Sequence, residues 1–190
     1  MDTWLLAAII VAVLAIVVIG AVAFVKARRR AALRRQFGPE YDRAVENADN
    51  RRKAEAELNK RAERRDQFQT RALDPAARDR YARQWRAVQT RFVDAPADSV
   101  QEADVLVTRV MRECGYPVEG FSDRSDFVSV DHPHLAEDYR EAHRIAVAET
   151  EGRVSTEDRR QAMVHFRSLF QALLGEDERV DQRHSQRRAG

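Results

Sequence analysis

The sequence predicts an all-α protein with an N-terminal transmembrane helix, a charged helical stalk and a small four-helix bundle-like domain. Three observations predict this fold class. Residues 1–25 contain an uncharged run of 23 residues, Thr3 to Val25. Residues 40–73 are dominated by charge, and residues 74–175 hold four segments whose apolar residues recur every three or four positions. Residues 26–39 join the first two parts as a basic juxtamembrane segment, and residues 176–190 are expected to form a disordered tail.

The N-terminal run predicts a transmembrane anchor, because 23 residues of helix can cross a hydrocarbon core of roughly 30 Å. Only Asp2 and the terminal amine precede the run. Six cations follow it: Lys26, Arg28, Arg29, Arg30, Arg34 and Arg35. The positive-inside rule then predicts a single-pass protein of the cell (inner) membrane, with its N-terminus outside and its C-terminal domain cytoplasmic. We expect the six cations to set this topology and to contact anionic lipid head groups.

A cleaved signal peptide is the alternative for the same segment. Ala21-Val22-Ala23 resembles a small-x-small cleavage site. No basic region precedes the apolar run, which is also longer than the apolar core of a typical signal peptide, about 7 to 15 residues. An exported protein therefore stays the alternative to a membrane-anchored one.

The stalk is expected to begin with a break in the helix at Gly38-Pro39. Residues 40–73 hold 9 basic and 8 acidic residues, and their apolar residues are too sparse to sustain the heptads of a coiled coil. Asp49 or Asn50 is expected to cap a helix after a turn. A solvated stalk and a segment that packs one side on the domain are both consistent with this pattern.

The four domain helices are predicted from apolar spacing and from their end signals. They run from Asp74 to Phe92, from "VDAPADSV" to Gly115, from Asp131 to about Thr150, and from Ser155 to just before Gly175. The first three open with an aspartate one or two positions before a proline, so Asp74, Asp94 and Asp131 are predicted N-caps. Ser155 and Asp158 predict a capping box. A long connection, residues 116–130, is expected to be held to the bundle by its apolar residues or by a short helix.

The stretch Ser129 to His143 places three of the five histidines among acidic residues. On one helix, however, His134 and His143 would lie on opposite sides, so they cannot share a metal ion. We interpret Asp131 as a cap and the neighbouring acids as favourable charges at a helix N-terminus, rather than as ligands. The pattern favours a structural role over a metal or acid/base site.

Sequence motifs of known enzymes are also missing, including GxSxG, GxxxxGK[ST], HExxH and paired CxxC. Cys114, the single cysteine, is interpreted as a core residue. Tyr81, Trp85 and Phe92 share one helix face, which is typical of a core, although they could also line an aromatic groove. We therefore assign no catalytic, cofactor-binding or metal-binding residue.

Charge excludes nucleic acid as the expected partner, because residues Asp74 to Leu174 hold 14 basic and 18 acidic residues. The composition favours a membrane-tethered, non-enzymatic interaction or scaffold module with an unknown protein partner, and a homo-oligomer is possible. The alternative is a domain that binds a small ligand or metal, possibly an enzyme, with a site between its helices near Tyr81, Trp85, His143 or His165.

Four phrases carry a family resemblance: "LRRQFGPEYDRAV", "RYARQWRAVQTRFVDAPADSVQEADVLVTRVM", "GYPVEGF" and "SVDHPHLAEDYREAH". Together with the apolar N-terminus, they resemble a widespread family of single-pass bacterial membrane proteins that is commonest in high-GC organisms such as actinobacteria. The resemblance covers about Leu33 to Gly175. It implies membrane association and a helical domain, and it supplies no known activity, substrate or catalytic residue.

Overall fold

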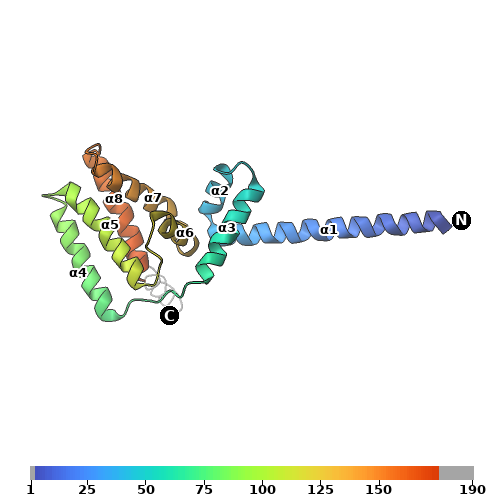
Figure 1. The fold of residues 1–190 in the computed structure, drawn as a ribbon, viewed down its shortest axis with the longest axis horizontal. Coiled ribbons are helices and arrows are strands. Elements are labelled where there is room, and N and C mark those ends of the chain that lie inside the picture. Colours follow the sequence, from blue (N-terminus) through green and yellow to red (C-terminus); the bar gives the residue numbers. More distant parts are fainter. Residues whose placement is uncertain (1–2, 176–190) are drawn as a thin grey trace, which may run out of the picture. The chain divides into compact units, whose positions relative to one another are not determined.

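The computed structural model describes residues 3–175, except for the side chains of Thr3, residues 5–11 and Ala15. Eight helices and no strand occur in this part of the chain (Figure 1), which confirms the all-α prediction. The chain divides into two compact units, Met1–Asn59 and Lys60–Gly190. The predicted tail, residues 176–190, lies outside the described residues.

The first unit contains α1 (Thr3–Phe37), α2 (Pro39–Glu46) and the greater part of α3 (Arg51–Asp66). Gly38 separates α1 from α2 with a φ of 48°, as the Gly-Pro pair predicts. Asn50 caps α3, because its side-chain oxygen accepts a 3.0 Å hydrogen bond from the backbone N–H of Lys53. The buried apolar residues of this unit are Leu33, Phe37, Tyr41, Ala54 and Leu58.

The predicted transmembrane helix is wrong. Among the helices that the structure describes, none combines the length and the apolar character needed to cross a bilayer. The predicted location, as a single-pass protein of the inner membrane, is therefore wrong as well.

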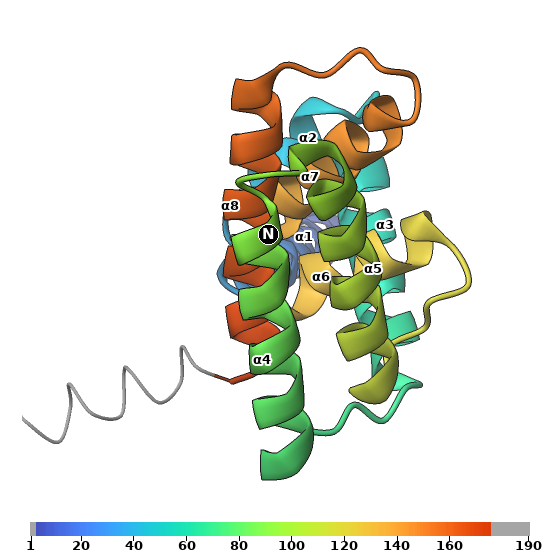
Figure 2. The same cartoon turned by 90° about the vertical axis from the view of Figure 1, so that its left-hand side faces the viewer.

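The second unit contains α4 (Pro75–Arg91), α5 (Pro96–Glu113), α6 (Phe121–Asp131), α7 (Ala136–Glu149) and α8 (Thr156–Leu173). Helix α5 packs against α4, α7 and α8, and α7 packs against α6 and α8. Figure 2 shows α4, α5 and α8 side by side. Trp85 of α4 stacks on Phe170 of α8 with ring centroids 4.9 Å apart. The apolar faces predicted for these helices therefore meet in one core.

Of the caps predicted for the four domain helices, two are confirmed. The Asp74 carboxylate accepts a 2.7 Å hydrogen bond from the backbone N–H of Ala77. Ser155 and Asp158 form the reciprocal bonds of a capping box.

The other two predicted caps are wrong. Ala95, not Asp94, occupies the N-cap of α5, and it makes no side-chain cap bond. Asp131 is the last residue of α6, and α7 begins at Ala136. Its carboxylate accepts hydrogen bonds from Arg65 and from the Tyr116 hydroxyl, so it serves tertiary packing instead of a helix end.

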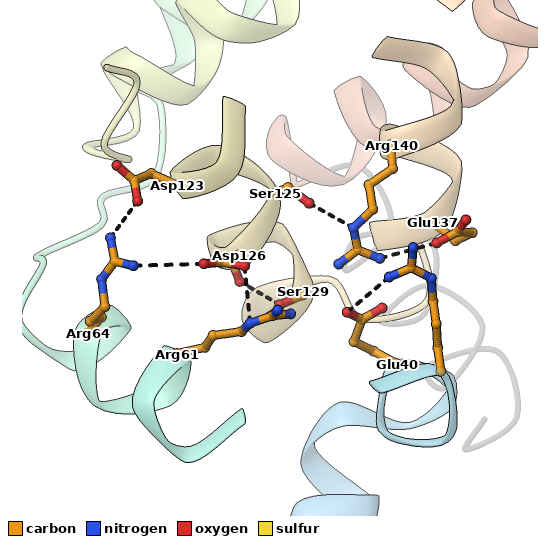
Figure 3. A network of polar contacts seen from close by, with 10 residues as sticks. Glu40, Arg61, Arg64, Asp123, Ser125, Asp126, Ser129, Glu137 and Arg140 are labelled. Carbon is orange, nitrogen blue, oxygen red and sulfur yellow. Dashed lines mark hydrogen bonds and ion pairs between the residues drawn. The ribbon is translucent and has the colours of Figure 1, made fainter. Parts of the chain in front are cut away.

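The predicted stalk, residues 40–73, is divided between the two units. The last turns of α3, from Lys60 onward, belong to the second unit, where three arginines pair with three aspartates of α6. Figure 3 shows Arg64 pointing toward both Asp123 and Asp126. The pairs are Arg61 with Asp126 at 3.1 Å, Arg64 with Asp123 at 2.5 Å, and Arg65 with Asp131 at 2.6 Å.

Candidate functional site

The six cations selected from the sequence all lie on α1 and are exposed. Two of them pair within the first unit: Arg30 with Glu55 at 3.2 Å, and Arg34 with Asp42 at 2.8 Å. Arg35 donates to the carbonyl of Ala31. The remaining three, Lys26, Arg28 and Arg29, make no ion pair with described residues. Their predicted contact with anionic lipid head groups stays a prediction.

Two histidines, His143 and His165, join helices of the bundle. His143 stacks on Phe121, with ring centroids 3.8 Å apart, and its Nδ1 lies 3.2 Å from the carboxylate of Asp104 on α5. His165 lies 3.3 Å from Asp138 of α7 through Nδ1. Each imidazole thus has one acidic neighbour on another helix, and they do not converge on a shared ligand position. His134 is exposed in the turn before α7.

Cys114 and the aromatic residues of α4 are part of the core. Burial, followed by the charge of Glu113, raises the pKa of the Cys114 thiol to about 11, so the thiol is protonated at neutral pH. The Tyr81 hydroxyl donates to Glu113 at 2.6 Å. Trp85 is 5% exposed, which leaves too little accessible surface for an aromatic groove on this helix face.

A cleft of about 530 Å³ in the second unit brings polar groups from several parts of the chain together. Residues from several parts of the chain form it: Thr70 to Leu73 and nearby Arg78, Cys114 with Tyr116, Asp131 with His132, and the C-terminal end of α8 from Ala172 to Gly175. It therefore lies where the end of α8, the start of α4 and the loops after α5 and α6 meet.

The wall formed by residues 70–73 is held by backbone bonds to the end of α5. The backbone N–H of Arg71 donates to the carbonyl of Cys114 at 2.9 Å. The side-chain Nε of Arg71 donates to the carbonyl of Glu113, also at 2.9 Å. Gly115 has a φ of 87°, and a Cβ there would lie 2.7 Å from the carbonyl oxygen of Gln69. Glycine is therefore required at this point for the two segments to approach each other.

The floor of the cleft is held by Asp131. Its carboxylate accepts hydrogen bonds from Arg65 Nε at 2.6 and 2.8 Å and from the Tyr116 hydroxyl at 2.8 Å. Arg65 also donates to the hydroxyl of Thr70 at 2.8 Å. Burial, with the neighbouring Asp131 charge, raises the pKa of the Tyr116 hydroxyl far above its usual range. These groups are fixed donors and acceptors rather than a pair arranged for proton transfer.

A second groove, of about 480 Å³, lies between α4 and α5. Arg91 of α4 and Glu102 of α5 line it and form an ion pair with each other. Because Arg91 and Glu102 pair with each other, neither is fully available to a charged ligand, and Asp98 and Arg109 are the other charged residues that line the groove.

No metal site is found in the described part of the chain, where no three His, Cys, Asp or Glu side chains lie close enough together to hold an ion. Comparisons with protein-family models, with curated proteins and with solved structures gave no match to this chain. The family resemblance of the sequence stays a prediction, and the site has to be interpreted from its own geometry.

None of the cleft residues Arg71, Arg78, Tyr116 and His132 was selected as a site from the sequence. Each lies in a different segment, so spacing along the chain carries no signal of their meeting. The local clue was Arg78, a cation between two residues of the predicted apolar face of its helix, Ala77 and Tyr81.

Proposed function

We propose that the chain is a non-enzymatic helical interaction module that binds a partner protein in the cleft between α8, the start of α4 and residues 70–73. The single observation that supports this best is the cleft itself. It has the volume of a binding site, and donors and acceptors from several parts of the chain converge in it. Its thiol and its phenol are held protonated by burial, so neither supplies a nucleophile at neutral pH.

A small-molecule binder is the second candidate, since pockets of about 300 to 1,000 Å³ commonly hold such ligands. Those pockets are mostly apolar, however, whereas about half of this cleft's lining is polar: Thr70, two arginines, Asp131 and His132 lie beside apolar residues such as Leu73 and Leu173. Backbone carbonyls at the end of α8 add acceptors that suit the N–H groups of a peptide. The polar lining favours the peptide segment of a protein over a compact apolar metabolite.

Site-specific photo-cross-linking of the full chain tests the proposal. A photoreactive residue replaces Ala72, an exposed residue of the cleft, and in a control Gln89, an exposed residue of α4 outside both grooves. We expect one identified protein to cross-link from position 72 and not from position 89. The purified partner should then bind the full chain, with an affinity that Ala72→Trp lowers at least about tenfold and Gln89→Trp leaves unchanged.

Equal cross-linking from both positions would overturn the proposal. So would a screen of metabolites in which one compound selectively raised the thermal midpoint and lost that effect in Ala72→Trp, because ligands that bind the folded state stabilise it. The second result would establish the small-molecule binder instead.

A further inference from the structure

Arg78 gives the cleft an unsatisfied cationic donor. Its side chain lines the cleft, and its Nε is buried without a hydrogen-bond acceptor among the described residues. Buried donors of folded proteins are nearly always paired, and leaving one unpaired is costly, more so when it is charged. A ligand in the cleft that accepted hydrogen bonds from the Arg78 guanidinium would offset part of that cost.

Arg71 supplies a second guanidinium to the same cleft. Its backbone N–H and its Nε are bonded to the carbonyls of Cys114 and Glu113, so the base of the side chain is fixed. Its terminal nitrogens make no ion pair with any side chain in residues 3–175. Two guanidinium groups that can each present paired N–H donors match the planar geometry of a carboxylate.

Negative groups in the cleft limit the charge of the ligand. Asp131 contributes a carboxylate fixed by Arg65 and Tyr116, and the C-terminal end of α8 carries the partial negative charge of a helix end. The lining residues include two guanidinium groups and one carboxylate, and that carboxylate is paired with Arg65. A monoanion fits this balance, whereas the second charge of a phosphate would face Asp131 and the carbonyls of α8.

We propose that the cleft binds a carboxylate of the partner's peptide segment, with Arg78 and Arg71 donating to the carboxylate and the end of α8 accepting peptide N–H groups. This inference rests on the proposed function and names the chemistry of the partner. Arg78 is the specificity-determining residue, since it places the buried donor. Residues 176–178, Glu-Asp-Glu, directly follow Gly175 in the sequence and are the rival source of carboxylates.

The experiment follows the side-chain Nε–Hε signals of arginine by NMR in the full chain, with Arg78 assigned from the signal missing in Arg78→Lys. Four probes are titrated: sodium acetate, inorganic phosphate, an N-acetyl tripeptide with a free C-terminus, and the same tripeptide amidated. We expect saturable shifts of the Arg78 signal with acetate and the free tripeptide, the tripeptide binding more tightly. The amidated tripeptide should cause none, and phosphate should bind more weakly than the free tripeptide.

Two variants test the role of Arg78. Arg78→Gln should weaken binding of the free tripeptide by about tenfold to a hundredfold, the loss expected for one charge-assisted hydrogen bond. Arg83→Gln, an exposed position on the same helix outside the cleft, removes the same charge and should leave the affinity unchanged. Circular dichroism of both variants checks that the helices persist, and Arg78→Lys should fall between Arg78→Gln and the unaltered chain.

The inference is overturned if no probe saturates the Arg78 signal, if phosphate binds most tightly, or if Arg83→Gln weakens binding as much as Arg78→Gln. A variant with Glu176→Gln, Asp177→Asn and Glu178→Gln should bind the tripeptide as the unaltered chain does. Tighter binding by that variant would identify the chain's own acidic segment as the occupant. If the tripeptide binds as expected but cross-linking finds no partner, the carboxylate site stands and the proposed function fails.

Discussion

Gly115→Ala is expected to destabilise the second unit more than any other Gly→Ala change in its described loops. The left-handed conformation at φ 87° costs an L-residue about 1 to 2 kcal/mol. Alanine also lowers the conformational entropy of the unfolded chain, which offsets about 0.4 to 1 kcal/mol of this cost. The new Cβ would also lie 2.7 Å from the carbonyl oxygen of Gln69, so one of the two backbones must shift. That shift strains the bond from the Arg71 N–H to the Cys114 carbonyl, which contributes about 1 kcal/mol.

The sum is a loss of about 2 kcal/mol, which lowers the midpoint of thermal unfolding by about 8 °C in a domain of this size. Two further glycines serve as controls that separate the cost of the left-handed φ from the cost of the close contact with Gln69. Gly152 has a φ of 68° but nothing within 4 Å of an added Cβ, so Gly152→Ala should cost only about 1 kcal/mol. Gly120 has an extended φ of −138° and open space around it, so Gly120→Ala should be nearly neutral.

Urea unfolding of the full chain, followed by circular dichroism and by the fluorescence of buried Trp85, measures the three variants. The reasoning is refuted if Gly115→Ala and Gly152→Ala lose the same free energy, because the close approach of Gln69 would then contribute nothing. A large loss in Gly120→Ala would show that factors other than φ and contact dominate.

Three further predictions concern the helix ends and the thiol. Asp74→Ala should lower the free energy of unfolding by about 1 kcal/mol, whereas Asp94→Ala should be nearly neutral, since only Asp74 caps a helix; similar losses would contradict this assignment. The hydroxyl and backbone N–H of Ser155 lower the pKa of Asp158, so Ser155→Ala should raise that pKa in an NMR titration of the carboxyl carbon. Because the folded pKa is depressed, the stabilisation is present above the ordinary pKa of aspartate and is lost as the pH falls through the folded value, so the effect of Ser155→Ala in urea should shrink in acid. Cys114 should react with a disulfide reagent at pH 8 at least about tenfold more slowly in the folded chain than in urea, since burial raises its pKa to about 11; equal rates would show that the thiol is accessible.

The helices that the sequence predicts best are those whose packing repeats along one face. Ala77, Tyr81, Trp85 and Val88 recur at spacings of three and four, and all four are buried. The start and end of such a helix follow from local chemistry, as the Asp74 cap and the glycine after α5 show. These features depend on neighbours in sequence, which is why they could be predicted.

Helix α6 and the cleft depend on residues far apart in the chain. Phe121 to Asp131 alternates serine, aspartate and apolar residues without a sustained apolar face, because its acids pair with arginines of α3. Asp131 resembles a cap in sequence, yet a partner 66 positions earlier takes its carboxylate. The apolar run of the N-terminus was also misinterpreted from the sequence. Its length predicted a membrane span that the helices of the described chain do not support.

The ion pairs between the end of α3 and α6 also decide where a shortened form of this protein can start. A fragment that began at Leu73 would retain every helix from α4 to α8 but lose the guanidinium partners of Asp123, Asp126 and Asp131. It would also uncover Phe127, whose ring meets that of Phe68 edge to face at 5.0 Å. Like-charged aspartates on one short helix would then repel each other, so an autonomous fragment has to begin at or before Lys60.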